Sequence, residues 1–180
     1  MHSIVRVSIA PDTKDWTWVL HRPCEECRFD ASAFRRDDVG RAIRENAASW
    51  APLLRSSEAS RRIRPDRWSV LEYACHVRDV LRVFDGRLMR MLSEDGPTFE
   101  NWDQNETATF ERYDRQDPST VSPEIVAAAD TLAARYESVT GAAWNRPGTR
   151  SNGSRFTVET LAIYGLHDPI HHLWDVTVSG

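Results

Sequence analysis

Cysteine is scarce in this sequence, which has three in 180 residues: Cys24, Cys27 and Cys75. An odd number does not suit a disulfide framework, and the N-terminus lacks the charged-then-apolar layout of a signal peptide. We therefore expect reduced thiols and a cytoplasmic protein.

Long apolar runs and basic clusters are also missing. No stretch approaches the roughly 20 apolar residues that a membrane-spanning helix needs, so no membrane partner is expected. The net charge is −4, and the densest basic run, residues 61–64, is short and is not interleaved with aromatic residues. Binding to nucleic acid is therefore not expected. Lysine is limited to Lys14 beside 22 arginines, a bias that we attribute to a GC-rich coding sequence.

Helical periodicity dominates from residue 37 onward. Apolar residues repeat at helical spacing over residues 37–54, 69–92, 123–144 and 157–176. Ser69 and Glu72 form a capping box at the start of the second segment, and Ser122-Pro123 is a start signal for the third. The pattern predicts an all-α four-helix bundle over residues 37–180, preceded by an irregular extended arm, residues 1–36, packed on the bundle.

A long polar connection, residues 93–122, joins the second and third predicted helices. Its aromatic residues are expected to anchor it by packing: Phe99, Trp102, Phe110 and Tyr113. Connections of this length inside a compact domain are usually functional or cross over the bundle.

Two histidines near the C-terminus are spaced for metal binding. His167 and His171 are four residues apart, which places them one turn apart on the same helix face. A metalloprotease of the H-E-x-x-H type is excluded, because Asp168, Pro169 and Ile170 lie between them and supply no glutamate base. On its own, a pair at this spacing is a weak signal.

His76 is the third candidate ligand. It lies near the N-terminal end of the second predicted helix, on a largely apolar stripe, and an imidazole that points into a bundle needs a partner. A core histidine hydrogen-bonded to a carbonyl is the alternative. Together with His167 and His171 it predicts a site for one divalent ion, although imidazole suits zinc, nickel, copper and iron alike.

Three motifs resemble the DinB family of metal-dependent helical bundles: WSVLEYACHVRDV around His76, FENWDQNE around Trp102, and LHDPIHHLWDV at the end of the chain. The resemblance covers residues 37–176 and implies an up-down-down-up bundle. It also implies that His76, His167 and His171 bind a divalent ion, commonly zinc or nickel.

Several polar residues are expected around this site. His172 is turned by about 100° from His171 and is expected to pack beside the ligands or contact them. The carboxylates of Asp79, Asp168 and Asp175 are candidate acceptors for imidazole N–H groups.

Further residues are expected to shape the surroundings. Trp102, Gln104 and Asn105 are expected to border a substrate pocket. Pro169 is expected to kink the last helix between the two ligands, with Gly165 small enough to permit it.

The Cys24-Glu-Glu-Cys27 segment has the spacing of half a zinc site, but the sequence contains no second C-x2-C pair. The alternatives are a structural metal site completed by His2 and His21, a redox pair, or two reduced thiols in a turn, which we take as the default. Cys75 is expected to be a small buried hydrophobic residue.

Three histidines with one open position are typical of catalytic rather than structural zinc. By analogy with the family, the leading hypothesis is a metal-dependent S-transferase or isomerase that activates a low-molecular-weight thiol, such as mycothiol, toward a small electrophile. A hydrolase that uses metal-bound hydroxide and a non-catalytic metal-binding stress protein are the alternatives. The expected partners are a small-molecule substrate and a second copy of the chain in a homodimer.

Overall fold

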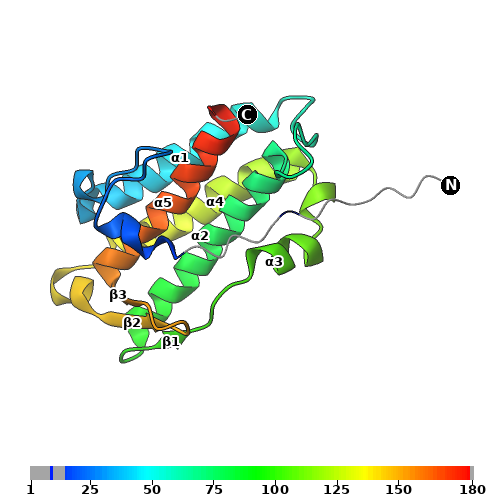
Figure 1. Cartoon of the computed structure of the whole chain (residues 1–180). Helices are drawn as coiled ribbons and strands as arrows, with labels where there is room; N and C mark the ends of the chain where they lie inside the picture. The colour runs from blue at the N-terminus through cyan, green and yellow to red at the C-terminus, as the bar shows by residue number, and fades with distance from the viewer. Residues whose placement is uncertain (1–8, 10–14, 179–180) are drawn as a thin grey trace.

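In the computed structural model, residues 9 and 15–178 are described, and four long helices form a bundle (Figure 1). They are α1 (Val39–Leu54), α2 (Val70–Ser93), α4 (Pro118–Glu137) and α5 (Val158–Thr177). A short helix, α3 (Gln104–Phe110), lies in the connection between α2 and α4. The predicted all-α four-helix bundle is therefore confirmed.

Shorter elements surround the bundle. The 3-10 helices are η1 (Trp16–Leu20), η2 (Ala31–Ala33), η3 (Arg36–Asp38), η4 (Tyr113–Arg115) and η5 (Gly141–Asn145). A small sheet at one end has the order β1-β2-β3, with β1 (Thr98–Phe99) parallel to β2 (Pro147–Arg150), and β3 (Arg155–Thr157) antiparallel to it. The sequence did not predict this sheet, because strands of two to four residues are too short to show an alternating pattern.

The third long helix begins earlier than its predicted start at Pro123. Asp117 caps it by accepting a hydrogen bond from the Ser119 N–H at 2.9 Å, and Pro118 occupies the first turn, where its missing N–H is harmless. Pro123 is accommodated within the helix. The helix ends at Glu137 and not at residue 144 as predicted. Gly141, with φ of +52°, begins η5, which covers the end of the predicted segment.

The first two long helices pack less against each other than against the last two. Both α1 and α2 pack mainly against α4 and α5. The core between them contains fully buried side chains from all four helices, including Trp50, Leu71, Ile125 and Leu161. No helix in the described part of the chain is long and apolar enough to span a membrane.

The segment before α1 covers one side of α5. Val19, Cys24 and Phe29 are buried in the common core, and η1 packs against α5 (Figure 1). Asn46 of α1 holds the same helix from another side, since its Nδ2 donates to the Pro169 carbonyl at 3.0 Å. The element α5 is therefore fixed by the arm, α1 and α2 together.

Gly165 allows α5 to approach α2 closely. A Cβ at this position would lie 2.6 Å from a ring carbon of Phe84, which is closer than real contacts allow. We had expected Gly165 to accommodate Pro169, but this contact gives it a separate role.

Gly165→Ala is expected to lower the free energy of unfolding by about 1–2 kcal/mol, because overpacking against Phe84 outweighs the gain in helix propensity. Gly86→Ala in α2 is the matched control, since nothing lies within 4 Å of its added Cβ. It should raise the free energy of unfolding by about 1 kcal/mol. Urea denaturation measures both, and stabilisation by both substitutions would contradict the predicted contact.

Candidate metal centres

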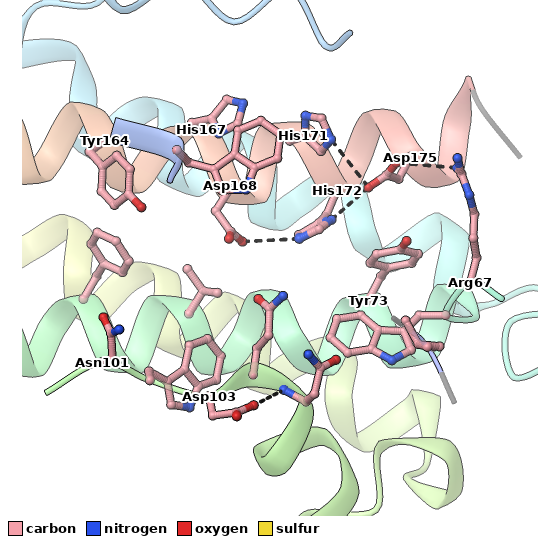
Figure 2. Close-up of a pocket in the computed structure, with 18 of the residues that line it drawn as sticks. Arg67, Tyr73, Asn101, Asp103, Tyr164, His167, Asp168, His171, His172 and Asp175 are labelled. Atoms are coloured by element: carbon pink, nitrogen blue, oxygen red, sulfur yellow. Dashed lines mark hydrogen bonds and ion pairs between the residues drawn. The ribbon is translucent and has the colours of Figure 1, made fainter. Parts of the chain in front are cut away.

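A cleft of about 610 Å³ lies between α2, α5 and the segment that leads into α3 (Figure 2). Trp68, Tyr73 and Trp102 supply aromatic walls, and Gln104 and Asn105 also line it. Clefts of this size hold small organic molecules.

Three side chains of types that can bind a metal, which we call the cleft cluster, meet beside this cleft: His76, Asp168 and His172. The Oδ1 atom of Asp168 lies 3.1 Å from His76 Nε2 and 3.7 Å from His172 Nε2. One ligand atom from each residue lies within 4.8 Å of the other two. The three side chains could therefore hold one ion without rearrangement of the backbone.

A carboxylate orients His172. Its Nδ1 lies 2.9 Å from Asp175 Oδ2, and Asp175 is in turn 3.7 Å from Arg67 (Figure 2). Because a carboxylate can only accept, a neutral His172 that donates from Nδ1 to Asp175 keeps its lone pair on Nε2, the atom that faces Asp168. This is the usual arrangement around a metal-binding histidine.

His76 is fully buried between two tryptophan rings. Trp102 stacks on it at 5.4 Å between centroids and 6° between planes, and Trp68 lies at 5.2 Å. Burial lowers the pKa of His76 and so favours the neutral imidazole that metal binding needs. Burial opposes ionisation of Asp168, but the neighbouring His76 and His172 outweigh it and hold the pKa of that carboxyl well below its usual range.

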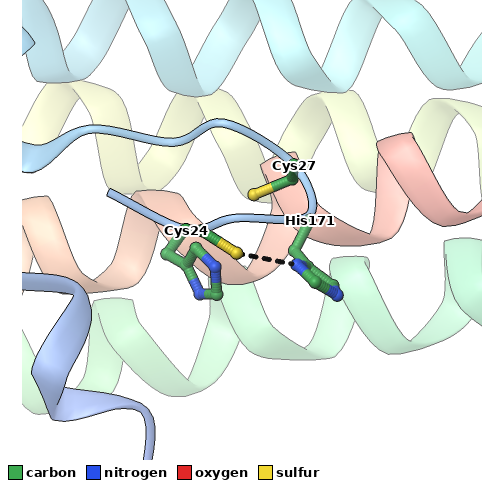
Figure 3. A group of neighbouring side chains, drawn as sticks. Cys24, Cys27 and His171 are labelled. Atoms are coloured by element: carbon green, nitrogen blue, oxygen red, sulfur yellow. Dashed lines mark hydrogen bonds between the residues drawn. The ribbon is translucent and has the colours of Figure 1, made fainter. Parts of the chain in front are cut away.

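A second group, which we call the arm cluster, joins the N-terminal arm to α5. It consists of Cys24, Cys27, His167 and His171, with one ligand atom of each within 4.8 Å of the others. Cys24 Sγ lies 3.8 Å from His171 Nδ1 (Figure 3).

The structure thus places the three predicted ligands in two clusters. His76 lies in the cleft cluster, whereas His167 and His171 lie in the arm cluster. The geometry of α5 explains the division: residues 167 and 171 form one pair at i, i+4, residues 168 and 172 form another, and the two pairs are turned by about 100°. Each pair faces a different neighbour of the helix.

Other expected site residues lie elsewhere. Asp79 accepts hydrogen bonds from Arg78, Arg82 and Tyr113 instead of a histidine. Cys75 is buried, and burial raises its pKa to about 12. His21 is exposed and belongs to neither cluster, while His2 is outside the described residues.

Arg87 and Arg150 are cleft residues that the sequence did not identify. Arg87 is 8% exposed, donates to the Glu100 carbonyl at 3.2 Å, and lies over the rings of Phe84 and Phe99. In the described part of the chain, no carboxylate lies within 4 Å of its guanidinium. The sequence feature that could have identified Arg87 is its position as a single charge on the apolar face of α2, three turns after His76.

Comparisons with known proteins agree with this architecture. A family model described as the DinB superfamily matches residues 34–176. Among solved structures, YfiT from Bacillus subtilis superimposes with a TM-score of 0.69 at 18% identity, over 79% of this chain and 85% of YfiT. YfiT is described as a probable metal-dependent hydrolase with an unusual four-helix bundle topology. A search of curated proteins found no match.

Proposed function

The chain belongs to the DinB superfamily, and on this basis we propose that it is a metal-dependent enzyme whose ion is held by His76, Asp168 and His172. The observation that carries the proposal is the convergence of these three donors beside a cleft, with His172 already oriented by Asp175. Two imidazoles and one carboxylate suit zinc and other divalent transition metals. Three protein ligands also leave a coordination position open, as in catalytic sites.

This ligand set replaces the one that the sequence suggested. His76, His167 and His171 belong to clusters on different sides of α5, whereas Asp168 and His172 face His76 directly.

The reaction that we propose is hydrolysis of a small molecule. A divalent ion at the cleft cluster would supply a water acidic enough to act as a nucleophile near neutral pH. Trp68 and Trp102 pack against the His76 ring and line the cleft beside it. The description of YfiT as a probable metal-dependent hydrolase supports this reaction class.

Two arginines of the cleft, Arg87 and Arg150, are suited to binding an anionic group of a substrate. Arg87 has no carboxylate partner among the described residues. Arg150 donates to the neutral side chains of Asn152, Ser154 and Tyr164, and the carboxylate of the exposed Asp15 is 4.0 Å away. A guanidinium binds carboxylate and phosphate groups through two parallel hydrogen bonds. We therefore propose that Arg87 and Arg150 hold an acidic group of the substrate while its reacting group lies at the cleft cluster.

Thiol transfer is the second candidate function. It was the leading hypothesis from the sequence, and a cleft of about 610 Å³ has room for a low-molecular-weight thiol beside a small electrophile. The two candidates differ in one requirement, because hydrolysis needs no added thiol.

The test compares tag-free wild type with the variant Asp168→Asn/His172→Gln, which keeps the size of both side chains. Elemental analysis should show one metal ion per chain fewer in the variant. Carboxylate-bearing esters, amides and phosphoesters are then assayed with and without a thiol. Turnover without thiol is expected in wild type and should fall at least about 100-fold in the variant.

His21→Gln is the matched control, because it removes an exposed histidine outside both clusters. Its metal content and turnover should equal those of wild type. Turnover that appears only with added thiol would favour transfer, and equal metal content in wild type and the double variant would overturn the proposed ligand set.

A further inference from the structure

The arm cluster lies on the side of α5 that faces the segment before α1 (Figure 3). Its ligands come from two places: a loop that precedes residue 34, where the family match begins, and a helix inside that match. Cys24, His167 and His171 are buried, and Cys27 is half-buried. All three cysteines in the structure are free, so no disulfide occupies the group.

The loop that carries the cysteines is shaped to present both sulfur atoms. The Arg28 N–H donates to the Cys24 carbonyl at 3.0 Å, and the Cys24 N–H donates to the Phe29 carbonyl at 2.8 Å. Arg28 has φ of +62°, a left-handed conformation that is rare for a residue with a side chain. Such a conformation persists only where the surrounding structure enforces it, and it is frequent where a loop clamps a ligand.

The histidines point to a missing ligand. His167 Nε2 is buried and has no hydrogen-bond partner among the described residues, although leaving a buried polar atom unpaired is unfavourable. On His171, Nε2 lies 3.4 Å from Glu26 Oε2 and 3.9 Å from Asp175 Oδ2, while Nδ1 faces Cys24. The carboxylates favour a proton on Nε2 and leave the Nδ1 lone pair free to bind a metal.

We propose that Cys24, Cys27, His167 and His171 bind a zinc ion that fixes the N-terminal arm to α5. Two thiolates and two imidazoles form a tetrahedral donor set preferred by zinc, and four protein ligands close the site, which makes it structural. When zinc binds, the two thiols release their protons to solvent. The site is separate from the cleft cluster, since the two clusters share no ligand.

Cobalt substitution tests the proposal, because a thiolate bound to Co²⁺ gives a charge-transfer absorption that nitrogen and oxygen ligands do not. Reduced, tag-free protein is freed of metal and titrated with Co²⁺. We expect the thiolate signal in wild type and its loss in Cys24→Ser/Cys27→Ser. Cys75→Ser is the matched control, because Cys75 is buried in α2 outside the cluster, and it should keep the signal. The cleft variant Asp168→Asn/His172→Gln should keep it too.

A measurement on wild type alone covers the case in which the double serine variant does not fold. Zinc should protect two of the three cysteines, Cys24 and Cys27, from alkylation, as identified by mass spectrometry. At zinc about 100-fold above the dissociation constant, the melting temperature should rise by about 5–10 °C. The absence of a thiolate signal in wild type, its persistence in the double serine variant, or equal alkylation with and without zinc would overturn the proposal.

Discussion

Arg87→Met is expected to raise the free energy of unfolding by about 1–3 kcal/mol while weakening the binding of anionic substrates at least 10-fold. Arg87 is buried against Phe84 and Phe99, and a buried charge without a counter-charge destabilises a fold. Burial, together with the nearby Arg150, lowers the pKa of Arg87 to about 10. Methionine fills a similar volume without the charge.

The lowered pKa of Arg87 determines how the stability gained in Arg87→Met depends on pH. The pKa of Arg87 is lower in the folded state than in the unfolded chain. The destabilisation by its buried charge is therefore complete below about pH 10 and decreases as the pH rises above it. The gain from Arg87→Met should therefore be present in full at pH 7. Urea denaturation measures it.

Arg82→Met is the control for Arg87→Met. Arg82 is on the same helix but is exposed, and it pairs with Asp79 at 3.2 Å. Its replacement should change the free energy of unfolding by less than about 1 kcal/mol. If Arg87→Met were destabilising, the hydrogen bond and ring contacts of Arg87 would stabilise the fold more than its buried charge destabilises it. Stability data would then give no support to an anion site at Arg87.

Trp50→Ala is expected to lower the free energy of unfolding by about 3–5 kcal/mol. The side chain is fully buried in the core, and its Nε1 donates to Asn46 Oδ1 at 3.2 Å. Asn46 in turn donates to the carbonyl of Pro169, which lies between the two members of each histidine-containing pair of α5. Loss of the indole therefore removes core volume and also releases the residue that holds α5 at the level of both clusters.

Trp50→Phe separates these two contributions, because it keeps most of the ring volume and removes the N–H donor. Trp50→Phe should lower the free energy of unfolding by less, about 1–2 kcal/mol. Thermal and urea denaturation measure both variants. Metal titration of Trp50→Ala below its melting temperature should show weaker binding at the cleft cluster, and unchanged binding would mean that Asn46 does not position α5.

The sequence was sufficient to predict the four long helices, because each carries its own local signals, whereas the short α3 lies in a segment predicted as a connection. The Ser69 and Glu72 capping box starts α2 where it was predicted, and the predicted segment 157–176 differs from α5 by one residue at each end. The start of α4 was misplaced because two proline start signals lie five residues apart, and Asp117 supplies the cap at the earlier one.

For the candidate sites, the sequence identified most of the residues but not how they group. His76, Asp168, His172 and the cysteine pair were all recognised as residues capable of binding or supporting a metal. Their grouping was not, because helical spacing shows which residues share a face but not which element that face meets. Arg87 was missed for the same reason, since a charge on an apolar stripe shows its function only when the cleft beside it is known.

The sequence by itself determined the four long helices and the types of residue that can hold a metal, since periodicity, caps and side-chain chemistry are local properties. The tertiary structure alone decided that residues 168 and 172 face His76 and that residues 167 and 171 face Cys24 and Cys27. The rotation of α5 about its axis causes this choice. Packing of the arm, α1 and α2 against that helix sets the rotation, and these contacts join residues far apart in the chain.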